Sequence, residues 1–518
     1  MNRHDAKTKD LSTERLFWEI RRAFHSPMNN PVFGVLFLQA VAIIFVGAKG
    51  AGRIYLSMIG ILFFITLCSW LFTSMIHGNR MILIYALTLL TVGTMLQCIF
   101  RQEQVLKNPQ YFESHSAVSS LQFQYLIGFF AAVVLCFFYL KFREISTIKI
   151  CRILFKVAVA LSVVTLIFAG SVGNAKNWIQ VGGISVQTTE FLKPLYVLIG
   201  AGLLGTREHP KKADVRAFII VTVVESLFLT MQSEFGTLLL LLLLFLMFLF
   251  LFVPDIRVFF STAGVVAAGS ILIALTGSGL GKLAQAGSFL GTNKFSAVFL
   301  RNYDKIANRF IYWLHPEKDP LGLGYQLLKA RESIVLGGWF GTSSVTDLPV
   351  KTSDLVYPAL IQRCGMVFAL LVFFVFILMW LEGVRMFVRK RDRYQKAVGA
   401  GCVFMLFDQA LIIIAGSTGL CPLTGITLPF ISSGGTSLMI SFIIVGLMIT
   451  VSGNVKWKGT IEDEKETDKF FKENAITAKC HAYLRYLNAH FAGKNFCNSA
   501  RRIKRSRQGK DQSEGTDV

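Results

Sequence analysis

Long uninterrupted apolar segments constrain the fold of this 518-residue chain more than any other feature. Residues 238–253 are leucine, phenylalanine and methionine up to a final valine, and residues 122–140 and 369–381 are similarly apolar. Lipid offers no hydrogen-bond partners, so a segment that crosses a bilayer must form all of its backbone hydrogen bonds internally. A helix of about 18 or more apolar residues does this. A mean hydropathy of +0.55 agrees with this interpretation. We therefore predict an all-α, polytopic membrane protein with about twelve transmembrane helices.

The candidate spans cover most of the chain up to residue 452. They run over residues 31–48, 55–74, 81–100, 122–140, 151–170, 189–205, 214–230, 235–253, 258–276, 355–387, 396–418 and 431–452. The first span follows a polar, basic stretch and shows no small-residue cleavage pattern, so we expect an anchor and not a removed signal peptide.

Basic residues concentrate in alternate connections between these spans. They include Arg15, Arg21, Arg22, Lys141, Arg143, Lys149, Arg207, Lys211, Lys212, Arg216, Arg257, Arg389, Lys390, Arg391 and Arg393. Cytoplasmic loops carry an excess of Lys and Arg, so these connections and both termini are predicted to be cytoplasmic. This bias also explains the net charge of +22, and nucleic acid is not expected as a partner. The basic run at 501–507 is read either as a contact to anionic lipid headgroups or as a solvated tail.

The predicted organisation has four parts. Residues 1–30 form a cytoplasmic segment, and residues 31–80 form two N-terminal transmembrane helices. Residues 81–452 form a transmembrane core with a long extracellular loop at 277–354, and residues 453–518 form a basic cytoplasmic tail. A loop of that length is usually functional, and its aromatic residues argue against disorder. The nine cysteines include no CxxC pair, and those of the tail lack the spacing of zinc ligands, so no protein metal site is predicted.

Two groups of ionisable residues near span ends suggest chemistry, because charged side chains in membrane segments are costly and tend to be functional. Glu190 and Lys193 are spaced i, i+3, so they share a helix face and can pair. Glu234 lies at the outer tip of a tight helical hairpin, where Ser233 is expected to cap the following helix. Glu234 is either a general base or merely a residue at a helix start.

Gly and Pro residues interrupt the helical pattern between Gly425 and Gly435, just before the last span. Irregular backbone at membrane depth is tolerated where it is buried in protein or lines a cavity. This segment therefore predicts a pocket that opens outward.

Four segments together resemble the SEDS family of bacterial peptidoglycan polymerases, the FtsW, RodA and SpoVE group. Residues 177–193 are similar to the family's R-W-I…Q-P-S-E…K stretch, and residues 232–237, Gln-Ser-Glu-Phe-Gly-Thr, to its Q-P-D-x-G-T. Arg309, Gly324–Gln326 and Gly337–Gly338 are similar to its long outer loop. Residues 421–432 are similar to its P-x-T-G-I-x-L-P-F-I-S and form the most specific match. The resemblance covers roughly residues 81–452, which would make a ten-helix family core with two added N-terminal helices.

The resemblance implies a reaction, a site and partners. Family members polymerise lipid II, a disaccharide-pentapeptide on undecaprenyl pyrophosphate, at the outer face of the bacterial cytoplasmic membrane during elongation, division or sporulation. Glu234 takes the position of the family's essential Asp, and Lys193 and Arg309 take cationic positions that can steady phosphates. The other residues expected to bind substrate are Trp178, Gln187, Glu190, Gln232, Thr237, Tyr325, Gln326, Asp354, Pro429, Ser432 and Gly434. A class B penicillin-binding protein is the expected partner beside membrane lipids, and a divalent cation is compatible with a pyrophosphate leaving group.

The chain also departs from the family pattern. Glu234 replaces the Asp, Ser233 replaces its preceding Pro, residues 362–365 read Gln-Arg-Cys-Gly where the family has Glu-Glu-x-G, and Ile413 stands for an Asn. These departures keep a second hypothesis open, a non-catalytic scaffold that binds lipid II or a partner. Glu225 and Asp408, which lie in apolar surroundings, keep a third one open, a flippase for lipid-linked precursors.

Overall fold

The computed structural model describes residues 31–47, 53–76, 78–107, 116–141, 147–172, 175–181, 184–285, 294–342 and 347–453. The predicted N-terminal segment 1–30 and the predicted tail beyond residue 453 lie outside the described residues.

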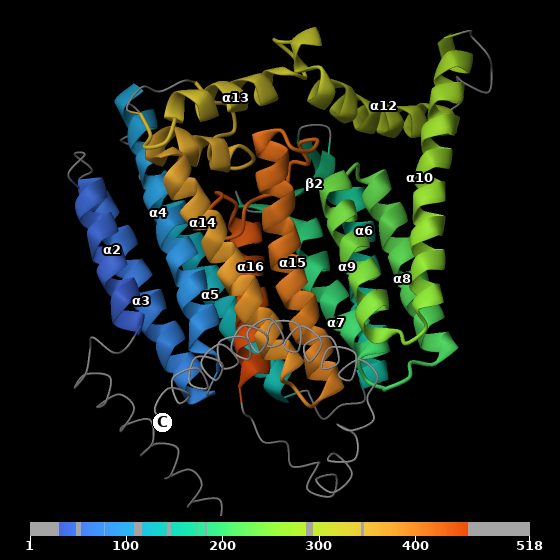
Figure 1. Ribbon diagram of the computed structural model, residues 1–518, viewed down its shortest axis with the longest axis horizontal. Coiled ribbons are helices and arrows are strands. Elements are labelled where there is room, and N and C mark those ends of the chain that lie inside the picture. The colour runs from blue at the N-terminus through green and yellow to red at the C-terminus, as the bar shows by residue number, and fades with distance from the viewer. Residues whose placement is uncertain are drawn as a thin grey trace, which may run out of the picture. The chain divides into compact units, whose positions relative to one another are not determined.

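Long apolar helices make up most of the described chain (Figure 1). They are α2 (Pro31–Gly47), α3 (Arg53–Met75), α4 (Arg80–Lys107), α5 (Ser116–Lys141), α6 (Thr147–Phe168), α7 (Leu192–Leu204), α8 (Lys212–Met231), α9 (Phe235–Phe252), α10 (Ile256–Gln285), α14 (Val356–Val388), α15 (Arg393–Thr418) and α16 (Gly435–Ser452). Each predicted span overlaps one of these helices. Among the described residues, seven helices are long and apolar enough to cross a membrane, namely α4, α6, α9, α10, α14, α15 and α16. The chain is a polytopic integral membrane protein, and the count of twelve crossings stays a prediction.

The core of the bundle lies around α15 and α16. α16 packs against α5 and α15, while α15 also packs against α14, α7 and α9. The apolar faces of these helices are buried against one another, and they supply much of the buried hydrophobic cluster. The N-terminal helices α2 and α3 pack on α4, and α3 also packs on α5.

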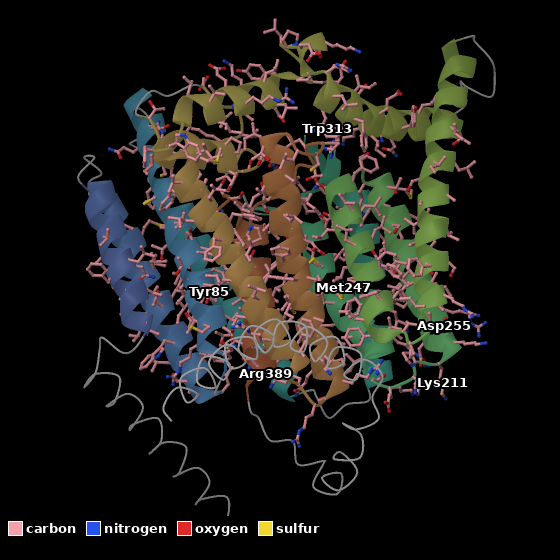
Figure 2. The ribbon with its side chains drawn as sticks, viewed as in Figure 1. Tyr85, Lys211, Met247, Asp255, Trp313 and Arg389 are labelled. Carbon is pink, nitrogen blue, oxygen red and sulfur yellow. The ribbon has the colours of Figure 1, made fainter. Side chains whose placement is uncertain are left out.

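Basic side chains stabilise the helix ends on one side of the bundle. Lys390 donates hydrogen bonds of 3.0 Å to the carbonyls of Ser452 and Gly453, and Arg393 donates one of 2.7 Å to the carbonyl of Phe252. Cations at these positions offset the partial negative charge of the C-terminal ends of α16 and α9. Figure 2 shows Lys211, Asp255 and Arg389 at this end of the helices and Trp313 at the opposite end. The connections that carry Lys211, Asp255 and Arg389, which were predicted to share one face, thus lie at one end of the bundle.

Much of the predicted outer loop 277–354 is helical. α12 (Lys294–Leu314), the short 3-10 helix η5 (Pro316–Lys318) and α13 (Tyr325–Gly337) follow α10, and α12 and α13 run across the end of the bundle that is opposite the basic connections (Figure 1). The connection between α6 and α7 forms a small antiparallel sheet that the sequence analysis did not predict. Its strands are β1 (Gly170–Val172), β2 (Ala175–Val181) and β3 (Ile184–Gln187) in the order β1-β2-β3, and the 3-10 helix η4 (Thr188–Phe191) leads into α7.

The turn that follows α13 packs against a kink in α14, which lies at Gly365 near the start of that helix. Gly365 has φ +88°, and a Cβ atom built on it would lie 2.3 Å from the carbonyl oxygen of Trp339, so only glycine fits there. The amide of Met366 donates to the carbonyl of Gly338 at 2.9 Å, and that of Val367 donates to the carbonyl of Trp339 at 3.2 Å. The segment that follows α13 is therefore fixed directly to the end of a long helix.

Candidate functional site

A cavity of about 1080 Å³ lies beneath α12. Its walls are one face of α12, the turn between α8 and α9, residues 350–354, the irregular segment 423–434 and side chains of β2 and β3. These segments are far apart in the sequence and belong to the predicted outer connections. The cavity therefore brings together the loops that the sequence analysis singled out.

Glu234 lines this cavity from the turn between α8 and α9. Its amide donates to the carbonyl of Leu229 at 2.9 Å, and its own carbonyl accepts the first hydrogen bond of α9, from Leu238, at 3.1 Å. Burial raises the pKa of the Glu234 carboxyl to about 7, and the negative charge of Glu190 acts in the same direction. Lys193, Lys305 and Arg309 oppose this rise in pKa. Near neutral pH the carboxyl can therefore both accept and release a proton.

The expectation that Ser233 caps α9 is wrong. Ser233 has φ +60°, which few residues other than glycine adopt, and the residue at the N-cap is Glu234 itself. The Ser233 hydroxyl donates instead to Oδ1 of Asn302 on α12, at 2.7 Å. Because the backbone of Ser233 is in the left-handed region, its hydroxyl does not cap α9 and contacts α12 instead.

Cationic side chains follow one face of α12. Arg301, Lys305 and Arg309 occur every fourth residue, so they share a helix face, and all three line the cavity. Burial lowers the pKa of both Lys305 and Arg309. Only Arg309 was predicted. The i, i+4, i+8 spacing was visible in the sequence, but nothing there indicated which face of this segment would meet the cavity.

The side chains of Arg309 and Asp354 both lie close to Gly425. Arg309 Nη1 donates to the carbonyl of Thr424 at 3.0 Å. A Cβ atom on Gly425 would lie 3.6 Å from Oδ2 of Asp354 and 3.9 Å from Nη2 of Arg309. Burial raises the pKa of Asp354, and the Arg309 cation opposes that rise. Gly425 has φ +73°, so glycine provides both the backbone conformation and the space between the two charged groups.

The irregular backbone predicted for Gly425–Gly435 is confirmed, and it forms one wall of the cavity through Thr427, Gly434 and their neighbours. α4 supports it from behind. Gln97 Nε2 donates to the carbonyls of Thr352 and Ile431, each at 3.0 Å. These bonds satisfy carbonyl groups that no helix satisfies, as non-helical backbone at membrane depth requires.

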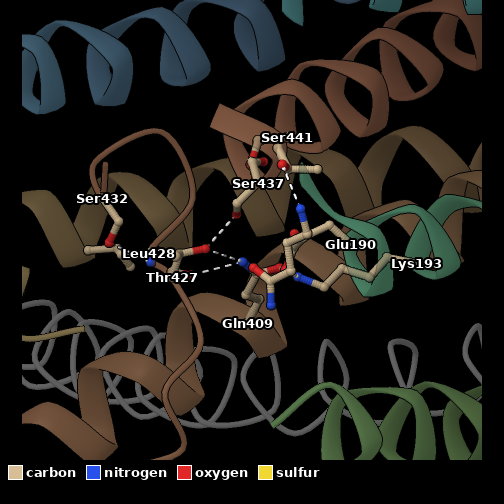
Figure 3. A network of polar contacts seen from close by, with 10 residues as sticks. Glu190, Lys193, Gln409, Thr427, Leu428, Ser432, Ser437 and Ser441 are labelled. Atoms are coloured by element: carbon tan, nitrogen blue, oxygen red, sulfur yellow. Dashed lines mark hydrogen bonds and ion pairs between the residues drawn. The ribbon is translucent and has the colours of Figure 1, made fainter. Parts of the chain in front are cut away.

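A buried polar network joins α7, α15 and the irregular segment (Figure 3). Lys193 Nζ lies 2.6 Å from Oε1 of Glu190, which confirms the predicted pairing, and donates to Oε1 of Gln409 at 3.0 Å. Gln409 Nε2 donates in turn to the carbonyl of Thr427 at 2.8 Å. The Lys193 side chain is 0% exposed, so the pair lies behind the cavity wall and not on it. Gln409 was not predicted, although a polar residue on an otherwise apolar helix was a usable signal.

The predicted site residues fall into two sets. Those that line the cavity are Trp178, Gln187, Glu234, Arg309, Gln326, Asp354 and Gly434. Those outside the lining are Glu190, Lys193, Gln232, Thr237, Tyr325, Pro429 and Ser432. Two of the second set hold walls in place, since Ser432 donates to the carbonyl of Ser353 at 2.7 Å and Gln232 donates to that of Ser162 at 3.2 Å.

Two of the unusual charged residues also have structural partners. Arg363, in the segment that departs from the family pattern, forms an ion pair with Glu103 of α4, which also pairs with Lys351 at 2.7 Å. Glu225 is buried and accepts a hydrogen bond of 3.0 Å from Ser162. Neither Glu225 nor Asp408 belongs to the residues that line the cavity.

Within the described residues, no group of three or more His, Cys, Asp or Glu side chains is placed to hold a metal ion. The charged groups that line the cavity are carboxylates and cations, among them Glu234, Asp354, Lys305 and Arg309.

Residues 79–456 match the FtsW/RodA/SpoVE family, described as cell cycle proteins. The chain is 32% identical over 290 residues to the probable peptidoglycan glycosyltransferase FtsW of Synechocystis, covering 54% of this chain and 66% of the relative. It is 28% identical over 287 residues to the stage V sporulation protein E of Bacillus subtilis, covering 54% and 71%. The matched segments thus span about two thirds of the length of these relatives.

A solved structure of a peptidoglycan synthase complex, described for the structural coordination of polymerization and crosslinking, contains a chain with a similar fold. The match covers 72% of this chain and 97% of that chain, with a TM-score of 0.53 and 16% sequence identity. At this identity the match supports the fold alone.

Proposed function

Because this chain belongs to the FtsW/RodA/SpoVE family, we propose that it is a peptidoglycan glycosyltransferase that polymerises lipid II on the outer face of the bacterial cytoplasmic membrane. One observation carries the proposal. Glu234, whose pKa is raised to about 7, shares a cavity with the cationic face of α12. A base and an anion-binding surface are the two components that this transfer requires.

In the proposed reaction, a sugar hydroxyl of the acceptor attacks the anomeric carbon of the donor from the side opposite the pyrophosphate. The new bond joins that carbon to the hydroxyl oxygen, the bond to the pyrophosphate breaks, and Glu234 takes the hydroxyl proton. The pyrophosphate leaves with the bonding electrons, and Arg309 and Lys305 stabilise its charge. The hydrogen bond to the carbonyl of Thr424 holds the Arg309 guanidinium in the wall, and the negative charge of Asp354 acts on it electrostatically.

The distribution of basic residues between the two ends of the bundle supports a site on the outer face of the membrane. The basic connections lie at the end opposite α12, so the positive-inside rule assigns that end to the cytoplasm and the cavity to the outer face. Both termini are cytoplasmic in this proposal. The proposed partner is a class B penicillin-binding protein that crosslinks the new strand, in elongation, division or sporulation.

The test is polymerisation of lipid II by the full chain, purified and placed in lipid nanodiscs, with and without a class B penicillin-binding protein. Glu234→Gln keeps the size of the side chain but removes the base, and should lower the rate by at least about a hundredfold. The control is Glu317→Gln, because Glu317 lies outside the cavity in the same outer segment with its side chain 66% exposed. Equal rates for Glu234→Gln and the wild type would reject Glu234 as the base.

The replacement of the family Asp by Glu234 favours a second candidate, a scaffold that binds lipid II without polymerising it. An extra methylene moves the carboxylate, and a misplacement of about 1 Å can lower a rate roughly a hundredfold. This candidate predicts that labelled lipid II binds to the nanodiscs without any polymer forming, whichever partner is added. Polymer formation that depends on Glu234 would exclude it.

A further inference from the structure

α12 holds both sides of the turn that carries Glu234. Asn302 Nδ2 donates to the carbonyl of Thr230 at 3.2 Å, and Asn302 Oδ1 accepts the 2.7 Å hydrogen bond from Ser233. Lys305 adds a longer contact of 3.4 Å to the carbonyl of Ser233. One amide side chain therefore spans the last turn of α8 and the residue next to Glu234.

These groups are nearly enclosed. Asn302 is 7% exposed and Ser233 is 5% exposed, although both lie next to a polar cavity. A buried hydrogen bond is costly to break, because the group left without a partner keeps the full penalty of its lost hydration. The contact between Asn302 and Ser233 therefore fixes the geometry of the turn more firmly than an exposed bond of the same length would.

The same contact is made at a residue of the turn whose backbone is in the left-handed region. Ser233 has φ +60°, a conformation that costs on the order of 1 kcal/mol or more for a residue with a side chain and persists only where the surroundings impose it. Its hydroxyl is engaged by Asn302, which gives this conformation a specific partner. Proline, whose φ is locked near −65°, cannot form this turn.

The helix that clamps the turn also carries the cations of the cavity. Lys305 follows Asn302 by three residues and Arg309 by seven, so the three side chains lie on neighbouring positions of one helical surface. A shift of α12 would move the cations, while loss of the clamp would let Glu234 move independently of them. The clamp thus links the turn that carries Glu234 to the helix that carries the cations.

We propose that Asn302 is a positioning residue that acts through Ser233 to hold the Glu234 carboxylate at a fixed place against the cationic face of α12. This inference rests on the proposed function for its consequence in catalysis, but the clamp itself can be measured without any turnover. The longer glutamate side chain has one more rotatable bond than aspartate, so a rigid turn is of particular value here.

The first measurement is infrared titration of the Glu234 carboxyl, taken as the difference between each protein and its Glu234→Gln counterpart in nanodiscs. We expect a midpoint near 7 in the wild type, as burial dictates. In Asn302→Ala the loosened turn admits water, so the midpoint should fall by at least about one unit. Tyr303→Phe removes a polar atom from the same turn of α12 and should leave the midpoint unchanged. An unchanged midpoint in Asn302→Ala would overturn the proposal whether or not the protein polymerises lipid II.

A double-mutant cycle tests the route through Ser233. Ser233→Ala should lower the midpoint in the same direction, and the shift in the double variant should be clearly smaller than the sum of the two single shifts, because both changes remove the contact between Ser233 and Asn302. Fully additive shifts would show that Asn302 acts by another route and would also overturn the proposal.

Polymerisation then separates the clamp from the proposed function. In an active wild type, Asn302→Ala should reduce the rate by about ten- to a hundredfold and move the acid limb of the pH–rate profile downward with the midpoint. If Asn302 had only a structural role, Asn302→Ala would lower the melting temperature and leave the acid limb of the pH–rate profile in place. An inactive wild type with the shifted midpoint would reject the proposed function and retain the clamp.

Discussion

At the scale of single residues, the properties of the site depend on how each charged group is buried. Glu234 is buried near cations and has a pKa of about 7, whereas Lys193 is buried with a carboxylate and an amide that satisfy it. The first arrangement keeps a group able to exchange its proton, and the second makes a rigid support. Sequence spacing predicted the partner of Lys193 within one helical turn. It could not predict Gln409, because that contact joins residues separated by 216 positions.

The raised pKa of Glu234 predicts how the proposed activity depends on pH. A carboxyl with its pKa raised from 4.5 to about 7 is protonated at pH 5.5 and ionised at pH 8. A general base works only when ionised, so the rate of lipid II polymerisation should rise about tenfold per pH unit below 7 and level off above it. Initial rates between pH 5 and 9 measure this. A plateau extending down to pH 5 would contradict it.

The same shift has a consequence for stability with a defined sign. Burial disfavours the ionised carboxylate in the folded protein, so stability should fall as the pH rises from about 4.5 through 7. Glu234→Gln should therefore raise the melting temperature at pH 8 and change it little at pH 4. The difference in melting temperature between Glu234→Gln and the wild type, measured at both pH values, separates the titration of Glu234 from any general effect of pH on the protein.

The buried pair of Glu190 and Lys193 predicts a large loss of stability when one partner is removed. Lys193→Met leaves the Glu190 charge buried without its cation, which should destabilise the protein by roughly 3–5 kcal/mol. Adding Glu190→Gln removes that charge and should recover most of the loss. Thermal unfolding in detergent measures both. The matched control is Lys329→Met, which breaks the exposed i, i+3 pair with Glu332 and should have little effect. Equal melting temperatures for the two lysine variants would refute this prediction.

At the scale of elements, the apolar runs predicted the long helices because membrane segments must be continuous and apolar. The segment before α16 was predicted to be irregular because Pro422 and Pro429 interrupt a helix and Gly425 and Gly434 disfavour one. The small sheet at 170–187 was missed because strands of three to seven residues carry too little alternation to stand out. The face that α12 turns to the cavity was not predictable, since it depends on how that helix lies across the bundle.

The close contact between α4 and the irregular segment predicts that one added methyl group changes the position of the irregular segment. A Cβ atom on Gly93 would lie 2.1 Å from the carbonyl oxygen of Phe430 and 2.8 Å from Cα of Ile431, both backbone atoms. Gly93→Ala should therefore displace this cavity wall and lower the affinity for labelled lipid II by about tenfold or more. The control is Gly264→Ala, because Gly264 also lies in a helix but has no atom within 4 Å of its added Cβ. Alanine there should stabilise the helix by up to about 1 kcal/mol. Equal affinities in the two variants would argue against a rigid wall.

At the scale of the whole molecule, the described part of the chain has two ends of different construction. One end carries Lys211, Arg389 and Lys390 at helix termini, and the other carries the helices that cover the cavity. This separation follows from the sequence, because the bias of basic residues between alternate connections depends only on the order of spans and loops. The contents of the end that α12 covers did not follow from it, since they depend on packing between segments far apart in the chain.

This polarity predicts which sites are accessible from outside the cell. Glu317→Cys lies on the outer segment and Lys211→Cys at the basic end, and both positions are exposed. In a variant whose nine native cysteines are replaced by serine, a maleimide that cannot cross membranes should label Glu317→Cys in intact cells. Lys211→Cys should become labelled only after the membrane is permeabilised. The reverse pattern would place the cavity on the cytoplasmic side, where its proposed substrate, lipid II on the outer face of the membrane, could not reach Glu234. Labelling of both positions in intact cells would instead show that the two ends do not lie on opposite sides of the membrane.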